Sequence, residues 1–447
     1  MIFHLFYGSV FMCGRDSLIL QGPEFMRLGT AQSAHRGCKQ VRRNNRQTFC
    51  HSAWVLLLAS LSGLLLADSS RLEAAEADLT PGGLQFRAQR LVLDNNEGCA
   101  VADINNDGHM DVVAGRHWYE GPEFRQHPLR EIAPFGKDYL ENNGDHVRDV
   151  NGDGWIDVVS SSFMPKQIYW YQNPGLEGLQ KNQLWKQHLL AEGASNNEIT
   201  FMQDLDEDGN AELVVDSWNA KADLVAWRFA EDGAKQPTLK QWIVGRGANG
   251  HGMGFGDING DGRGDILFAQ GWYECPPKTD LDKPWKLHSD WQWVGASCPV
   301  LVKDINGDGR ADIIRGNGHD YGIYWLEQLE PVDGKTAWRE HLIDNSYSQL
   351  HALAWADLDG DGAGELITGK RVRAHSGGDP GATEPPCLYY YTWNVAEGRF
   401  ERHTIEEGHV GTGLQLRVAD MNADGRLDLI TPGKSGTHIL YNEGPEK

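Results

Sequence analysis

The feature that most restricts the fold of this chain is a nine-residue pattern that occurs seven times. Each copy reads Asp, an apolar residue, Asp or Asn, a variable residue, Asp, Gly, two variable residues and a final Asp or Glu. A motif that returns every 46 to 63 residues is typical of a repeat protein, in which similar units pack against one another. The copies begin at Asp103, Asp149, Asp204, Asp257, Asp304, Asp357 and Asp420.

The segments around each copy favour β-strands. A short apolar stretch precedes the pattern, as at 300–302, and a β-branched stretch follows it, as at 312–314. An aromatic-rich segment comes next, and then a segment in which an aromatic residue stands three before a histidine, as in Trp185 and His188. We expect these recurring histidines to serve packing. Four strands in each of seven units predict an all-β fold, a seven-bladed β-propeller of four-stranded blades.

The two ends of the repeat region complement each other. The last unit stops after its third strand, at 438–442, whereas residues 86–93 precede the first loop and resemble an unpaired fourth strand. We therefore expect the N-terminal strand to complete the last blade and close the ring. Closure removes the open sheet edges that would otherwise pair with other chains.

The charge of the chain restricts its partners. Its 447 residues carry a formal net charge of −22, and no basic cluster lies in the repeat region. Such a surface repels phosphate backbones and anionic membranes, so nucleic acid is excluded as a partner. We expect a monomer.

Residues 1–77 differ from the rest of the chain. Arg42, Arg43 and Arg46 precede the apolar run 54–67, and the small residues at 75–77 suit a cleavage site. We interpret 1–77 as an export signal with an upstream extension, removed or disordered, and 78–447 as a single propeller domain. The chain would then be periplasmic, extracellular or at the cell surface, without a membrane span in its mature form. A retained N-terminal anchor is the alternative, although the run is shorter than the roughly 20 residues that a span needs.

The repeated loop has the ligand spacing of a calcium site. Oxygen-bearing side chains at positions one, three, five and nine, with a carbonyl near position seven, can surround a calcium ion, and glycine at position six allows the turn. We expect up to seven calcium ions. The alternative is that these side chains only make turn hydrogen bonds. The predicted ligands are Asp103, Asn105, Asp107, Asp111, Asp149, Asn151, Asp153, Asp157, Asp204, Asp206, Asp208, Glu212, Asp257, Asn259, Asp261, Asp265, Asp304, Asn306, Asp308, Asp312, Asp357, Asp359, Asp361, Glu365, Asp420, Asn422, Asp424 and Asp428.

On these loops the chain resembles the FG-GAP or VCBS repeat family, whose best-known members are the integrin α-subunit propellers. The resemblance covers about residues 84–447. Phe255 and Gly256 form the one Phe-Gly pair directly before a loop, and the Gly-Ala-Pro element is absent. The resemblance implies a propeller fold, calcium in the loops between first and second strands, and an extracellular setting.

The face opposite these loops is rich in histidine. The residues six before each loop start, where the innermost strands begin, are Glu97, Asn143, Glu198, His251, Cys298, His351 and Leu414. Of these, Glu198, His251, Cys298 and His351 come from consecutive units and would suit zinc or a related transition metal. The alternatives are a polar pocket without chemistry, and a disulfide between Cys298 and Cys275.

Three functions fit these observations. The first is an exported, calcium-binding propeller that binds a ligand, carbohydrate or an extracellular protein, on the histidine-rich face. The second is a metal-assisted sugar lyase or dehydratase, with His146 or His319 as base and Arg116 or Arg371 neutralising the oxyanion. That arrangement is distantly similar to the propeller part of the aldos-2-ulose dehydratases. The third is an adhesion or protein-interaction scaffold.

Overall fold

The computed structural model describes residues 83–163, 165–230, 237–247, 250–297, 299–333 and 335–445. The export signal predicted within residues 1–77 lies outside these ranges. The described part is built mainly of β-strands, with one short helix, α1 (Gly175–Gln180), and the 3-10 turns η1 (Lys278–Asp280) and η2 (Ala374–Gly377). None of its helices is long and apolar enough to cross a membrane. The all-β prediction is confirmed.

Five sheets are four-stranded antiparallel meanders, which form blades of a β-propeller. The first two contain β2 (Cys99–Ala102), β3 (Asp111–Ala114), β4 (His117–Glu120) and β5 (Arg125–Pro128), then β8 (Gly144–Arg148), β9 (Asp157–Ser161), β10 (Gln167–Gln172) and β11 (Lys186–Glu192). The third contains β12 (Ile199–Gln203), β13 (Glu212–Asp216), β14 (Leu224–Phe229) and β15 (Leu239–Gly245). The last two contain β24 (Leu353–Ala356), β25 (Glu365–Gly369), β26 (Cys387–Asn394) and β27 (Arg399–Glu407), then β28 (Arg417–Ala419), β29 (Asp428–Thr431), β30 (Thr437–Pro445) and β1 (Leu84–Val92).

A sixth, eight-stranded sheet differs from the prediction of seven separate blades. It contains β16 (Met253–Gly256), β17 (Asp265–Phe268), β18 (Gly271–Glu274), β19 (Lys286–His288), β20 (Val300–Lys303), β21 (Asp312–Gly316), β22 (Tyr321–Val332) and β23 (Lys335–Ser348). Its halves are joined by a parallel pairing of β16 with β20, at Gly254 with Val300 and Phe255 with Leu301. Glycine permits this approach, because a Cβ on Gly254 would lie 2.2 Å from the Val300 carbonyl oxygen. A small two-stranded sheet pairs β6 (Pro134–Phe135) with β7 (Tyr139–Leu140).

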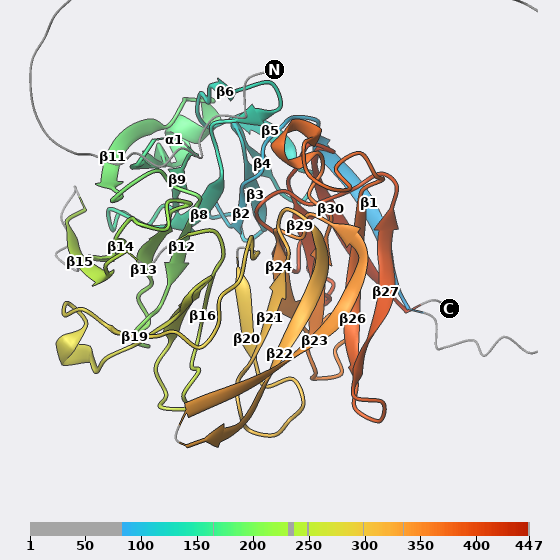
Figure 1. The fold of residues 1–447 in the computed structure, drawn as a ribbon. Coiled ribbons are helices and arrows are strands. Elements are labelled where there is room, and N and C mark those ends of the chain that lie inside the picture. Colours follow the sequence, from blue (N-terminus) through green and yellow to red (C-terminus); the bar gives the residue numbers. More distant parts are fainter. Residues whose placement is uncertain are drawn as a thin grey trace, which may run out of the picture. The chain divides into compact units, whose positions relative to one another are not determined.

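The two ends of the repeat region share one sheet. Strand β1 pairs antiparallel with β30, from Leu84 opposite Pro445 to Val92 opposite Thr437. This is the closing strand expected from the sequence. Figure 1 shows the sheets arranged around a centre toward which their first strands, β2, β8, β12, β16, β20 and β24, are turned.

The recurring histidines of the outer strands serve packing, as the sequence indicated. Each stacks on an aromatic side chain of the neighbouring strand with ring centroids 4.0 to 4.6 Å apart. Each also hydrogen-bonds a side chain of that strand, as His288 does with Glu274 at 2.7 Å. The stacked pairs are His127 on Trp118, His188 on Trp170, His288 on Trp272, His341 on Trp325 and His403 on Tyr390.

Candidate functional sites

The seven acidic loops share one hydrogen-bond pattern. In the first loop, Asp103 Oδ1 accepts from the amide of Asp107, and Asp103 Oδ2 accepts from that of Gly108. The ninth residue, Asp111, is buried and accepts from the amides of Ile104 and Gly121. The two bonds to the first residue and the bond that corresponds to Ile104 on the ninth recur in every copy. The turn bonds of the alternative interpretation are therefore present. In the first loop each oxygen of Asp103 accepts one of these bonds and keeps a second lone pair for a cation.

The ninth carboxyl group of each loop is buried among other acids. Burial, with a smaller contribution from loop acids such as Asp107, raises the pKa of Asp111, Asp157, Asp265 and Glu365 to about 7, although amide hydrogen bonds oppose the shift. Oxygens that converge in a ring of mutually repelling carboxylates form a donor set that fits a hard cation such as calcium. The carboxylates of Asp204, Asp206 and Glu212 lie within 4.8 Å of one another, as do those of Asp357, Asp359 and Asp361.

The loops differ in how their charge is balanced. Arginine occupies position seven in the loops that begin at Asp257, Asp304 and Asp420, and its guanidinium contacts the acid at position five. In the loop at Asp204, Arg228 pairs with Asp206 at 2.5 Å and with Glu212 at 2.8 Å. The loop at Asp357 has four acids and Ala363 at position seven. Its four carboxylates therefore have no arginine at position seven to offset their charge.

Three histidines converge on the opposite face, and we call them the imidazole cluster: His251, His319 and His351. His251 precedes β16, His351 precedes β24, and His319 lies in the connection from β21 to β22. Nε2 of His251 and Nε2 of His319 are 2.9 Å apart. The ring of His351 lies 4.8 Å from that of His251 and 4.9 Å from that of His319, centroid to centroid. One ligand nitrogen from each of the three fits within 4.8 Å of the others.

The second nitrogens of two of these rings are occupied by acceptors. His251 Nδ1 is 2.7 Å from the carbonyl oxygen of Ala296, and His319 Nδ1 is 2.9 Å from Asp379 Oδ2. In the neutral rings both Nδ1 atoms must then carry the proton, so the two facing Nε2 atoms present lone pairs to each other. Only a proton or a metal ion between them makes this arrangement favourable. Carbonyl or carboxylate partners on Nδ1 are the usual outer contacts of metal-binding histidines.

His351 distinguishes between these two possibilities. Its side chain is fully buried, and neither of its ring nitrogens has a hydrogen-bond partner within the described part of the chain. Burial, together with Arg371 and the neighbouring imidazoles, holds its pKa well below the usual value. A proton shared by His251 and His319 would leave this neutral ring unsatisfied, whereas a metal ion among the three rings would use it. Leaving a buried polar group unpaired costs about 1–3 kcal/mol.

The cluster borders a cavity of about 430 Å³, which we call the mouth pocket. Glu198 lies beside His251, with Oε1 3.4 Å from its Nε2. Burial alone would lower the pKa of His251, but the charge and hydrogen bond of Glu198 raise it overall. Trp218 is 48% exposed, an unusual degree for so large an aromatic ring. The pocket is lined by Phe135, Tyr139, Phe163, Glu198, Trp218, His251, His319, Arg371 and His375.

A buried ion cluster, made of Glu97, Arg371 and Lys434, lies at one side of this pocket. Arg371 donates from Nε and Nη2 to the two carboxylate oxygens of Glu97, at 2.8 and 2.6 Å. Lys434 Nζ donates to the same carboxylate at 3.1 Å and lies 3.8 Å from the centre of the Tyr139 ring. The three residues come from segments before β2, after β25 and after β29. They therefore connect three neighbouring parts of the ring.

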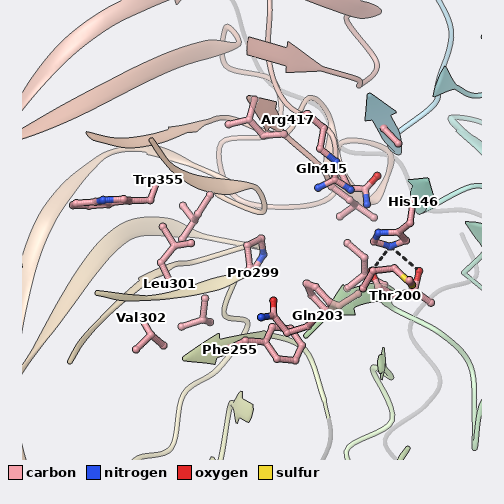
Figure 2. A pocket seen from close by; sticks show the side chains of 18 of the residues that line it. His146, Thr200, Gln203, Phe255, Pro299, Leu301, Val302, Trp355, Gln415 and Arg417 are labelled. Carbon is pink, nitrogen blue, oxygen red and sulfur yellow. Dashed lines mark hydrogen bonds between the residues drawn. The ribbon is translucent and has the colours of Figure 1, made fainter. Parts of the chain in front are cut away.

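The structure brings together some of the predicted site residues and separates others. Five of them lie at or beside the mouth pocket, namely Glu198, His251, His319, His351 and Arg371. His146 lines a different cavity, where its Nε2 lies 2.8 Å from the carbonyl oxygen of Thr200 (Figure 2). Arg116 donates to the carbonyl oxygen of Ile132 instead. Neither residue is among those that line the mouth pocket.

The two remaining candidate residues are cysteines. Cys298 lies outside the described residues. Cys275, its possible disulfide partner, is a buried free thiol whose Sγ is 3.6 Å from the carbonyl oxygen of Leu205. Sequence reasoning missed Asp379, which orients His319. The available signal was the widest spacing between loops, 63 residues from Asp357 to Asp420, because the extra residues include the segment that carries Asp379.

The comparison with protein families agrees with this architecture. The model of an FG-GAP-like repeat matches residues 149–215, 204–268 and 304–368. Each match runs from the start of one acidic loop into the strand that follows the next loop. No curated protein matches the sequence. The chain thus carries FG-GAP-like repeats in a β-propeller arrangement.

Proposed function

We propose that this propeller of FG-GAP-like repeats binds a carbohydrate in the mouth pocket with the help of one transition-metal ion held by the imidazole cluster. The observation that carries the proposal is the convergence of three imidazoles, two of which face each other through Nε2 while the third is fully buried and has no hydrogen-bond partner among the described residues. Three imidazole nitrogens suit zinc, and such a site keeps a position open for a ligand.

The aromatic lining of the mouth pocket supports a sugar as the ligand. Phe135 stacks on Phe163 at 5.9 Å, and Tyr139 meets Phe163 edge-on at 5.7 Å. Trp218 offers a half-exposed ring, while Glu198 and Arg371 supply polar groups. A sugar ring has apolar faces and hydroxyl groups at its edge, so a pocket that combines aromatic walls with a few polar groups suits it.

The rest of the proposal concerns the scaffold. We count the eight-stranded sheet as two blades joined through β16 and β20, which gives seven blades with the five separate ones. We assign calcium to the loops between first and second strands, and we infer that the chain is exported, in keeping with the extracellular setting typical of FG-GAP repeats.

A second candidate function is a metal-assisted sugar lyase or dehydratase in the same pocket. Glu198 favours it, because its carboxylate lines the pocket beside His251 and can accept a proton. Burial would raise the pKa of Glu198, but His251 lowers it overall and keeps the group ionised. A bound metal ion would acidify a neighbouring C–H or hydroxyl group of the sugar. Turnover of a bound sugar, with loss of water or cleavage of a bond, distinguishes this function from binding alone.

The metal assignment predicts the effect of removing one ligand. In the purified protein, we expect about one zinc, iron or manganese ion per chain by elemental mass spectrometry, in addition to calcium. His251→Ala and His351→Ala should each lose this ion and weaken zinc binding in a calorimetric titration by at least about tenfold. His409→Ala is the matched control, because His409 is exposed and pairs with Glu406 at the surface. Absence of the ion from the wild type, with no uptake of added zinc, would refute the assignment.

The sugar assignment predicts a role for Trp218. Trp218→Ala should weaken binding of the glycans selected on an array by about tenfold or more, because exposed aromatic side chains in binding pockets often dominate affinity. The melting temperature should stay unchanged, since the side chain is already half exposed. Leu189→Ala, which removes a similarly exposed apolar side chain from β11, should leave glycan binding unaltered. Equal glycan binding by both variants would contradict the sugar assignment.

A further inference from the structure

A second cavity, of about 620 Å³, lies within the ring of first strands, and we call it the central channel. Residues from β2, β8, β12, β16, β20, β24 and β28 line it. An apolar layer separates it from the mouth pocket. Ile199 and Leu414 are buried there and pack with Phe163, which lines the mouth pocket, and with Phe201, which lines the channel. The two cavities are therefore separate binding volumes.

The charge of the channel is opposite to that of the protein. Acidic side chains outnumber basic ones 63 to 41 in the chain, yet the only charged residues lining the channel, within the described ranges, are Lys303 and Arg417. Arg417 uses Nε and Nη2 for the carbonyl oxygens of Cys99 and Asp145, each at 3.0 Å. Among the described residues, its guanidinium therefore bonds carbonyl groups and makes no ion pair with a carboxylate. Two basic groups that share a concave site attract an anion.

Most of the other residues that line the channel have apolar side chains. The cavity that Arg417 lines is also lined by Phe255, Leu301, Val302 and Trp355 (Figure 2). His146 adds no charge, because burial and the nearby Arg417 lower its pKa to about 4. A cavity of this size and composition suits a small molecule with an apolar body and one anionic end.

We propose that the central channel is a binding site for an organic carboxylate with an apolar chain. The carboxylate lies near Arg417, and the chain contacts the apolar walls around Leu301 and Phe255. This site is independent of the metal and sugar assigned to the mouth pocket.

Octanoate is a suitable probe, and 1-octanol is its uncharged counterpart with the same chain length. Calorimetric titration is carried out on the whole protein in excess calcium, so that the acidic loops at the ends of the first strands carry counterions. We expect one octanoate per chain, bound at least about tenfold more tightly than 1-octanol, which corresponds to about 1.4 kcal/mol. Failure of octanoate to bind, or equal affinities for both compounds, would overturn the proposal.

Two variants at one position locate the site without disturbing the arginine that joins neighbouring blades. Leu301 lines the channel and is partly exposed. Glutamine and glutamate have the same shape and differ in charge, so Leu301→Gln and Leu301→Glu form a matched pair. Octanoate affinity should fall at least about tenfold from the Gln to the Glu variant, because like charges repel in a cavity. His351→Ala should bind octanoate as the wild type does. Equal affinities of the two Leu301 variants, or loss of binding in His351→Ala, would place the octanoate elsewhere and refute the channel site.

Discussion

Removal of calcium is expected to lower the melting temperature of the protein by at least about 10 °C. Each loop holds three or four carboxylates at positions one, three, five and nine, and the ninth acid is buried. Without cations these charges repel, and several sites of even modest affinity together contribute several kcal/mol at millimolar calcium. The measurement is thermal unfolding in excess chelator, compared with the same sample after calcium is restored.

The loop at Asp357 provides a sharp control for this prediction. Asp359→Asn keeps an oxygen ligand and gives the loop the asparagine that five other loops have at position three. It removes one of four repelling carboxylates where no arginine occupies position seven. The variant should therefore lose less stability than the wild type in chelator and melt at nearly the same temperature in calcium. An unchanged wild-type melting temperature in chelator, with metal loss confirmed by elemental analysis, would contradict the assignment of calcium to the loops.

Glu97→Gln is expected to destabilise the fold by about 3–5 kcal/mol, because it leaves two buried cations without their shared carboxylate. The side chains of the cluster, Glu97, Arg371 and Lys434, are almost fully shielded from solvent. The Arg371 guanidinium makes two of the three hydrogen bonds to the carboxylate. Chemical denaturation measures the loss. The matched control is Glu397→Gln, which breaks a surface pair with Arg399 and should cost less than about 1 kcal/mol.

The same carboxylate should make the fold sensitive to acid. Burial would raise the pKa of Glu97, but Arg371 and Lys434 lower it overall to about 2 from 4.5. Because the folded pKa is lower, the stabilisation is present above pH 4.5 and is lost as the pH falls from about 4.5 toward 2. Glu97→Gln should lack this component of the acid response. Identical stabilities of the Glu97 and Glu397 variants at neutral pH would show that the ion cluster contributes little.

The sequence predicted the local parts of the structure well. Each acidic loop is short and determined by its own residues, so its spacing predicts both the turn and the strands on either side. The count of six residues before each loop start also worked for Glu198, His251 and His351, because equivalent positions of first strands lie at one level of a ring.

The remaining features depend on contacts that local patterns do not encode. His146 lies three residues before its loop rather than six, which is about 10 Å deeper along the strand, inside the channel. His319 and Asp379 come from long connections whose paths are determined by packing. The joining of β16 and β20 depends on a close backbone approach at Gly254, which a single glycine in a strand does not predict.

The sharing of one sheet by β1 and β30 has a consequence for how the protein is made. More than 340 residues separate the paired positions Val92 and Thr437, so at 5–20 residues per second β1 leaves the ribosome roughly 20 to 70 s before its partner exists. During that time β1 is an unpaired edge that other nascent chains can bind. Arg87 and Arg90 lie on this strand, and charged side chains on such segments oppose aggregation. The strand that closes the ring thus carries its own protection for the period before closure.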